Sequence, residues 1–117
     1  MKFLLDTNFL VDIFAFKIGL VSELSKFGRP ELFALSSVFA ELEKIRSRQR
    51  RFSRMAADFA GSECFLIESG QPVDTALLSM AKKGYVICTQ DAALRKKISL
   101  LSLKSVAIRQ KKYLEMI

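Results

Sequence analysis

Short apolar runs recur along the chain, and longer segments with apolar residues at helical spacing separate them. A run without polar alternation is typical of a strand buried on both faces, as in a parallel sheet. The pattern predicts five such strands, at residues 3–5, 32–35, 65–67, 85–88 and 105–108.

The segments between these strands predict helices. They are expected at residues 8–16 and 20–27, from 38 to about 60, from 72 to a stop at Gly84, and from 91 onwards. The third would be broken, if anywhere, near residues 51–53, and the residues after 108 form a basic tail. Alternating strands and helices indicate an α/β fold, with a parallel sheet covered by helices on both faces.

The length of the chain, 117 residues, suits one hydrophobic core and is too short for two. No Pro/Gly-rich linker divides it, so a single domain is expected over residues 1–117. Asp6 interrupts the apolar start, and no run approaches the length needed to span a bilayer. Cys64 and Cys88 fit neither a disulfide scaffold nor a zinc motif. These features predict a cytoplasmic protein.

The charged residues narrow the function classes. The formal net charge is +7, from 19 basic and 12 acidic residues. Such a surplus favours a polyanionic partner such as RNA, DNA or an anionic membrane, although a lineage of basic proteins would explain it equally well. The absence of histidine excludes Ser-His-Asp and Cys-His catalysis, RNA cleavage by paired histidines and histidine-rich zinc sites. A hydrolase built from this sequence would need carboxylates with a metal, or a lysine.

Four carboxylates occupy similar positions in the predicted strand–helix units. Asp6 follows the first strand directly, and Asp91 lies three residues past Cys88 at the start of a helix. Glu41 lies in the first turns of the helix after the second strand, and Asp74 opens the helix before the fourth. Ligands of open α/β sheets bind at the carboxyl ends of the strands. All four carboxylates can therefore converge on one pocket if these strands are neighbours.

Clustered carboxylates raise each other's pKa and destabilise the fold unless a cation compensates. Mg²⁺ and Mn²⁺ prefer oxygen ligands, so a pocket lined by carboxylates suits them. One or two such ions can activate a water and stabilise the leaving oxygen of a phosphodiester. The basic residues elsewhere would then hold the phosphate backbone of a nucleic acid.

At three of these four positions, a structural role would explain the acid as well as metal binding does. Asp74 and Asp91 are ordinary acids for the start of a helix, where they could serve only as caps. Glu41 competes with Glu43, and one of the two could be merely solvated. Asp6 differs, because an acid that directly closes a buried strand has no simple structural explanation.

Four segments resemble, in order, the acidic motifs of the PIN-domain ribonucleases. They are Leu4–Leu10 (LLDTNFL), Val38–Ile45 (VFAELEKI), Val73–Leu78 (VDTALL) and Ile87–Leu94 (ICTQDAAL). The ending Arg109–Leu114 is also similar to endings of stand-alone archaeal PIN proteins. Each motif is weak alone, but four in order at appropriate spacing are specific and cover essentially the whole chain.

This resemblance implies a three-layer α/β/α sandwich with a central, mainly parallel sheet, and a Mg²⁺- or Mn²⁺-dependent endoribonuclease. The metal-binding and catalytic site would consist of Asp6, Glu41, Asp74 and Asp91. Asn8 and Thr89 would orient carboxylates or water, or else simply cap the helices that follow them. Some relatives carry an additional acid beside Asp91, where this chain has Gln90 and Ala92–Ala93. One strong metal site and one weak site are therefore expected.

Residues 46–54 contain five arginines. On one helix Arg46, Arg50 and Arg54 would lie on the same face, where they could follow RNA phosphates. A solvated helix or a flexible loop is the alternative. A second candidate RNA-binding patch is Arg95–Lys97, with Lys96 at its centre.

These features lead to the hypothesis of a metal-dependent endoribonuclease. The resemblance implies in-line attack by water that leaves a 5′-phosphate and a 3′-hydroxyl. It also suggests the toxin of a VapC-type toxin–antitoxin pair, acting as a homodimer with an antitoxin partner. A stand-alone RNA-processing nuclease is the alternative within the enzyme class, and an RNA-binding scaffold that has lost catalysis is the rival outside it. A phosphate-signalling domain is disfavoured, because Asp6-Thr7 lacks the acid pair that it requires.

Overall fold

A computed structural model describes residues 1–46 and 51–117 of the chain. Six strands form one sheet: β1 Lys2–Leu5, β2 Glu31–Leu35, β3 Phe65–Ile67, β4 Val86–Cys88, β5 Ser105–Arg109 and β6 Tyr113–Met116. The helices are α1 Thr7–Ala15, α2 Leu20–Leu24, α3 Ser36–Arg46, α4 Arg51–Glu63, α5 Val73–Lys82 and α6 Ala92–Leu100.

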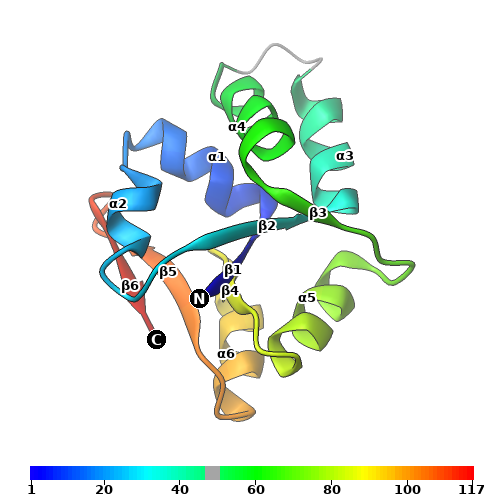
Figure 1. Cartoon of the computed structure of the whole chain (residues 1–117), viewed down its shortest axis with the longest axis vertical. Helices are drawn as coiled ribbons and strands as arrows, with labels where there is room; N and C mark the ends of the chain where they lie inside the picture. Colours follow the sequence, from blue (N-terminus) through cyan, green and yellow to red (C-terminus); the bar gives the residue numbers. More distant parts are fainter. Residues whose placement is uncertain (47–50) are drawn as a thin grey trace.

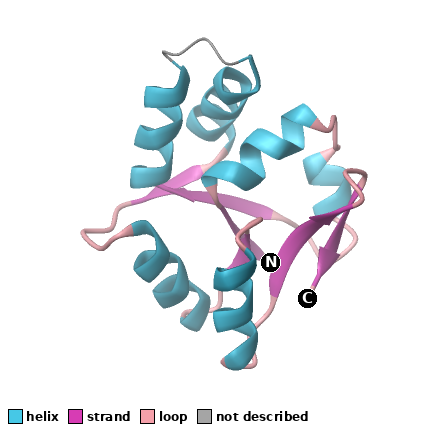
Figure 2. Ribbon diagram, turned by 180° about the vertical axis from the view of Figure 1, so that it is seen from behind, coloured by secondary structure: helices cyan, strands magenta, loops and turns pink. Residues whose placement is uncertain are grey.

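The sheet is the middle layer of the molecule. Its strand order is β3-β2-β1-β4-β5-β6, and every neighbouring pair is parallel except β5 and β6. Helices α1, α3 and α4 lie on one face, and α5 and α6 lie on the other (Figures 1 and 2). The three-layer sandwich with a mainly parallel sheet is thus confirmed, with one strand more than the five expected.

The additional strand, β6, replaces the expected basic tail. It pairs with β5 in a hairpin in which Arg109 lies opposite Tyr113. The backbone N–H of Lys112 donates to the carbonyl of Arg109 at 3.0 Å, and Gln110 and Lys111 both have positive φ. These are the features of a type I′ turn, which matches the twist of a hairpin. Asn-Gly or Asp-Gly usually marks such a turn, and this chain has neither here, so no local signal predicted the hairpin.

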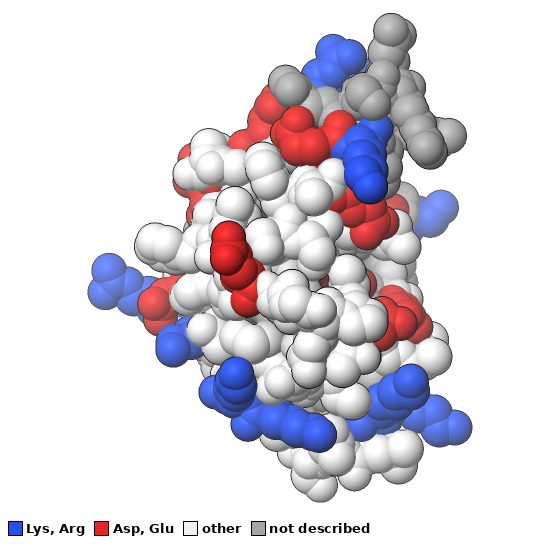
Figure 3. Space-filling view, turned by 90° about the vertical axis from the view of Figure 1, so that its right-hand side faces the viewer, with Lys and Arg blue, Asp and Glu red and all other residues white. Residues whose placement is uncertain are grey.

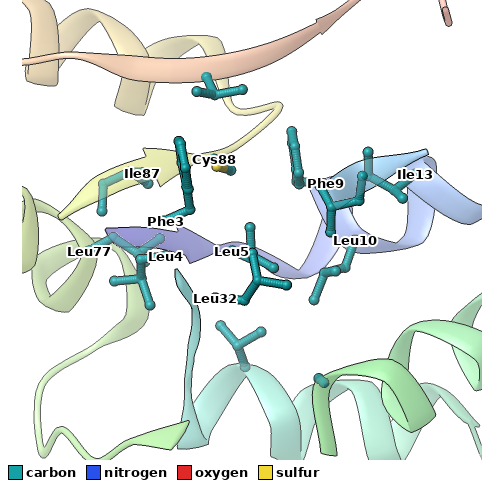
Figure 4. Packing of buried hydrophobic residues seen from close by; sticks show 14 of the residues in the cluster. Phe3, Leu4, Leu5, Phe9, Leu10, Ile13, Leu32, Leu77, Ile87 and Cys88 are labelled. Atoms are coloured by element: carbon teal, nitrogen blue, oxygen red, sulfur yellow. The ribbon is translucent and has the colours of Figure 1, made fainter. Parts of the chain in front are cut away.

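The hydrophobic core lies on both sides of the central strands. Phe3, Leu4 and Leu5 of β1 are completely buried, as expected for a strand covered on both faces. Figure 4 shows their side chains among those of Phe9 from α1 and Leu77 from α5. The core thus fixes β1, and with it the residue that follows β1, from both faces of the sheet.

The helix predicted from residue 38 to about 60 is two helices. Helix α3 ends at Arg46 and α4 begins at Arg51, and the two pack against each other (Figure 2). Residues 51–53, where a break was expected, lie within α4. Arg46 and Arg54 belong to different helices, so the prediction that three arginines share one helical face is wrong.

The remaining helix ends follow the sequence more closely. Helix α5 ends just before Gly84, whose φ of +99° is a conformation that side chains disfavour. Within residues 1–46 and 51–117, no helix is long and apolar enough to cross a membrane.

Candidate active site

The candidate site lies at the carboxyl ends of β1 and β4, where the strand order of the sheet reverses. Strand β1 leads to β2 on one side, whereas β4 leads to β5 on the other. Leu5 and Cys88, the last residues of β1 and β4, are neighbours in the parallel register. Asp6 and Thr89 follow them directly. Open α/β sheets bind their ligands at such a point.

Asp6 is held by both adjoining strands. Its backbone N–H donates to the carbonyl of Cys88 at 3.0 Å, which continues the pairing of β1 with β4. Its carboxylate accepts hydrogen bonds from the Thr7 backbone N–H at 2.8 Å and from Thr89 Oγ1 at 2.9 Å. Asp6 is also the N-cap of α1, so it has a structural role that the sequence did not reveal. Asn8 is therefore not needed as the cap of α1. Thr89 is not the N-cap of α6 either, because Asp91 has that position.

Thr89 connects Asp6 to Asp91. Its hydroxyl is buried, donates to Asp6 Oδ2, and accepts the backbone N–H of Asp91 at 3.1 Å. Asp91 is the N-cap of α6, and its Oδ1 accepts the backbone N–H groups of Ala93 and Leu94 at 3.0 and 3.2 Å. Both cap bonds use one oxygen, so the cap leaves the other oxygen of this carboxylate for a ligand.

Two further side chains fix the turn between β4 and α6, and the sequence had assigned neither of them this role. Arg95 Nη1 donates to the carbonyl of Thr89 at 3.0 Å. Gln90 Oε1 accepts the backbone N–H of Ile108 at 3.0 Å, which ties the turn to β5. Arg95 was expected on an RNA-binding surface. It is partly buried and holds the turn instead, because one turn of α6 separates it from Asp91.

The environment of Asp6 disfavours its charged form. Burial raises the pKa of its carboxyl above the ordinary value of 3.8, and the negative charges of Asp74 and Asp91 raise it further. The hydrogen bonds from Thr89 and Thr7 act in the opposite direction and lower this pKa, but burial has the larger effect. Three carboxylates thus act on one another at this edge, which is the situation that a cation would relieve.

A Thr89→Val substitution tests the link between these residues. Valine has a similar shape but no hydroxyl, so Asp6 Oδ2 loses its donor. Because that hydrogen bond lowers the pKa of Asp6, we expect the pKa in the variant to rise further above 3.8. Titration of the side-chain carboxyl carbons by NMR measures the shift. Thr75→Val, a matched change at an exposed position of α5, should leave the pKa of Asp6 in place.

Asp74 faces the same region from the other helix on this side of the sheet. It lies in the first turn of α5 and is exposed. Together with Asp91 it lines a cavity of about 160 Å³ between α5 and α6. The other lining residues are Thr75, Leu78, Ala93, Leu94 and Lys97. Asp74 and Asp91 therefore share one cavity, which Asp6 does not line, and their charges act on Asp6 at the same edge of the sheet.

Glu41 stands apart from this group. It is exposed on α3, and it is not among the charges that raise the pKa of Asp6. Glu43, its competitor in the sequence, is also exposed. The structure thus brings three of the four predicted acids together and leaves the fourth on a neighbouring helix.

The charge distribution on this side of the molecule differs from the net charge of the chain. Figure 3 looks at the side on which α3 and α5 lie in Figure 1. Acidic side chains gather across the middle and upper part of this face, and most of the Lys and Arg side chains lie above and below them. A chain with a net charge of +7 therefore presents an acid-rich surface bordered by basic residues.

Comparison with known proteins places this geometry in a family. Residues 3–111 match the profile of the PIN-like domain. The chain belongs to the PIN-like domain family. It is 33% identical over 96 residues to Ribonuclease VapC9 of Archaeoglobus fulgidus, a match covering 79% of this chain and 71% of that protein. It is 28% identical over 124 aligned residues to Ribonuclease VapC4 of Methanocaldococcus jannaschii, covering 97% and 95%.

A solved structure shows the same fold. The PIN-like domain described here superposes on the PIN domain endonuclease Utp24 with a TM-score of 0.81, over 98% of this chain and 90% of the other. The two sequences are 19% identical, so the likeness concerns the fold alone.

The acids of this PIN-like domain fit a divalent cation by their chemistry. They offer only oxygen ligands, and burial together with the negative charges of Asp74 and Asp91 raises the pKa of Asp6, an effect that a bound cation would offset. In the described parts of the chain, no three His, Cys, Asp or Glu side chains stand close enough to hold one ion together. Asp74 and Asp91 are exposed, so both carboxylates are accessible to a cation from solvent.

Two hydroxyl groups near this edge add to the polar character of the site. Thr7 Oγ1, at the start of α1, and Ser37 Oγ, at the start of α3, are buried and have no hydrogen-bonding partner among the described residues. Buried polar groups are nearly always paired, often through water or a ligand. Sequence reasoning had assigned no role to Thr7. Asn8, which it had selected, is exposed on α1.

The predicted RNA-binding residues fall into two groups. Arg54 on α4 and Lys96 on α6 are exposed and can be reached by a polyanion. Arg50 and the side chain of Arg46 lie outside the part of the chain that the structure describes.

Proposed function

We propose that this chain is a divalent-metal-dependent endoribonuclease that reacts at the Asp6 edge of the sheet. The observation that carries the proposal is the hydrogen-bonded series Asp6–Thr89–Asp91, with the charge of Asp74 close enough to raise the pKa of Asp6. It lies at the ligand-binding edge of a chain without histidine. The relatives named Ribonuclease VapC9 and VapC4 support RNA as the substrate.

The chain's own residues would act mainly by holding charge in place. Carboxylates of Asp6, Glu41, Asp74 and Asp91 would bind Mg²⁺ or Mn²⁺. When bound, such a cation supplies positive charge next to a phosphate and makes water a better nucleophile. Thr89 keeps one oxygen of Asp6 oriented by donating to it, and Arg95 holds the carbonyl of Thr89. Asn8 would contribute a polar group at the mouth of the site.

The basic residues would contribute affinity for the RNA backbone. The acid-rich face repels phosphates, so RNA binding there depends on the basic side chains around the site, and a bound cation strengthens it. Exposed Arg54 and Lys96 would serve in this role, as would the arginines at positions 46 and 50. Such contacts hold the RNA without reading its sequence.

The biological role that we propose is the toxin of a VapC-type toxin–antitoxin pair. The names of the two archaeal relatives support it. An antitoxin would be the protein partner, and a homodimer the active form. A stand-alone RNA-processing nuclease would use the same site without such a partner. A neighbouring gene whose product binds this chain and suppresses cleavage distinguishes the two.

Metal dependence provides the test of this function. A mixture of structured and single-stranded RNAs, labelled at the 5′ end, is incubated with the protein in Mg²⁺, in Mn²⁺ and in EDTA. We expect internal cleavage with either ion, none in EDTA, recovery when Mn²⁺ is restored, and 5′-phosphate ends on the downstream fragments. Equal cleavage in EDTA would show that carboxylate-bound metal is not the basis of the reaction. Binding of RNA without cleavage under every condition would favour the scaffold instead.

A further inference from the structure

Lys97 lies in the wall of the cavity that contains the two exposed acids of the site. The residues of α6 that line this cavity are Ala93, Leu94 and Lys97. Ala93 and Lys97 are four positions apart, so they share one face of the helix. Lys96, one position earlier, is exposed and does not line the cavity. The helix therefore directs one of two adjacent lysines towards the acids and the other away from them.

Among the described residues, the ammonium group of Lys97 has no ion pair with a carboxylate. Within residues 1–46 and 51–117, no ion pair joins Lys97 to Asp74 or Asp91, although all three line the same cavity. A cation that shares a cavity with two carboxylates and pairs with neither is available to a ligand. The ammonium group is positively charged, so the ligand for this lysine must be an anion.

The cavity limits what that anion can be. Its volume of about 160 Å³ is below the range of about 300–1,000 Å³ typical of pockets for whole small molecules. A phosphate group with a few waters fits such a space, whereas a complete nucleotide does not. Leu78 and Leu94 give part of the cavity an apolar wall.

We infer that Lys97 binds a backbone phosphate of the RNA in the cavity between α5 and α6, beside Asp74 and Asp91. The inference rests on the proposed nuclease function for the identity of the polyanion. The contact holds the RNA backbone beside Asp74 and Asp91, and Lys97 thereby helps to bind the substrate. Lysine serves here as a point charge, which a phosphate accepts in many orientations.

A purely structural role for Lys97 must be separated from this one. It is the basic residue in the last turn of α6, where it would also favour the helix dipole. Lys82 occupies the same place in α5, is exposed, and does not line the cavity. Lys82→Gln therefore reproduces the change in net charge and in the helix dipole that Lys97→Gln makes.

The test measures RNA binding without cleavage. All proteins carry Asp6→Asn, so that the RNA stays intact, and bind a fluorescein-labelled pool of random single-stranded RNA in Mg²⁺ at several KCl concentrations. Each lost phosphate contact reduces the slope of log K against log [KCl] by about 0.7 for single strands. We expect Lys97→Gln to reduce the slope by about this amount and Lys82→Gln to leave it unchanged. Lys97→Arg should restore it. Thermal melts should show similar small shifts for both glutamine variants.

The outcomes separate this inference from the proposed function. Equal slopes for Lys97→Gln and Lys82→Gln, or no recovery with Lys97→Arg, would overturn the phosphate contact even if the wild-type protein cleaves RNA. A slope that depends on Lys97, in a protein whose wild type never cleaves, would support the contact and overturn the nuclease. Failure of the parent protein to bind RNA at all would overturn both.

Discussion

Asp6→Asn should abolish RNA cleavage and at the same time make the protein more stable at neutral pH. Asparagine keeps the shape of the side chain and one oxygen, which can accept from the Thr7 backbone N–H, so the cap of α1 is preserved. Its amide nitrogen takes the place of the oxygen that accepts from Thr89, and it can donate to Thr89 Oγ1 instead. It removes the charge that the proposed metal site requires. Loss of one preorganised electrostatic group typically costs about 10²–10³ in rate, and we expect a loss of at least that size.

The gain in stability follows from the direction of the pKa shift. The folded state raises the pKa of Asp6 above 3.8, so it binds this proton more tightly than the unfolded chain does. The contribution of Asp6 is therefore most favourable below pH 3.8 and is lost as the pH rises through the folded-state pKa. Above that pKa, the charged carboxylate destabilises the fold. Asp6→Asn removes this cost, so the variant should be more stable than the wild type at neutral pH.

Thermal melts across a pH series measure this effect. The difference between Asp6→Asn and the wild type should be positive at neutral pH and should disappear at pH values below 3.8. Asp12→Asn is the matched control, because Asp12 is a partly buried aspartate of the same helix and belongs to no part of the site. It should retain full cleavage. A fully active Asp6→Asn, or one that is less stable at neutral pH, would contradict this explanation.

Phe9→Ala should produce the largest loss of stability. Phe9 is completely buried and packs with the core residues of β1 and α1 (Figure 4). Truncating a buried phenylalanine to alanine removes apolar burial and leaves a cavity, at a cost of about 3–5 kcal/mol in the free energy of unfolding. Urea unfolding followed by circular dichroism measures it. Phe65→Ala, at a position 68% exposed where the ring contacts Phe33, should cost less than about 1.5 kcal/mol.

The same substitution also distinguishes packing within one chain from packing between two chains. Phe9, Phe14 and Phe16 could have formed either a dimer surface or part of the core. Phe9 is buried within one chain, and the ring of Phe14 packs edge-on against Phe59 at 5.7 Å. The loss in Phe9→Ala should therefore be independent of protein concentration. A loss that shrinks as the concentration rises would instead indicate that Phe9 stabilises a dimer.

The fold was predictable where apolar runs are unbroken and helix stops are clear. The five parallel strands lie within a residue or two of their expected positions, because burial on both faces leaves little choice of residue type. Strand β6 could not be predicted, since its hairpin turn uses Gln110 and Lys111 at positive φ and its flanks are basic. These residues form a strand because they pair with β5, and the local sequence pattern contains no information about that pairing.

The site was predictable as a set of positions but not as a set of contacts. Asp6 and Asp91 follow strands that proved to be neighbours, and this placed both at one edge. The three consecutive basic residues of α6 looked equivalent in the sequence. In the folded chain Arg95 holds Thr89, whereas Lys96 and Lys97 are both exposed and only Lys97 lines the cavity. Only the packing of α6 against the sheet decides which side chain faces which way.

Binding of Mn²⁺, measured by isothermal titration calorimetry, tests the central claim most directly. The claim is that the carboxylates around Asp6 form a cation site on which RNA cleavage depends. We expect the wild type and Asp12→Asn to bind Mn²⁺ with the same affinity, and Asp6→Asn to lose measurable binding together with cleavage. Undiminished binding of Mn²⁺ by Asp6→Asn, or cleavage of RNA by a wild-type protein that binds no Mn²⁺, would contradict the claim.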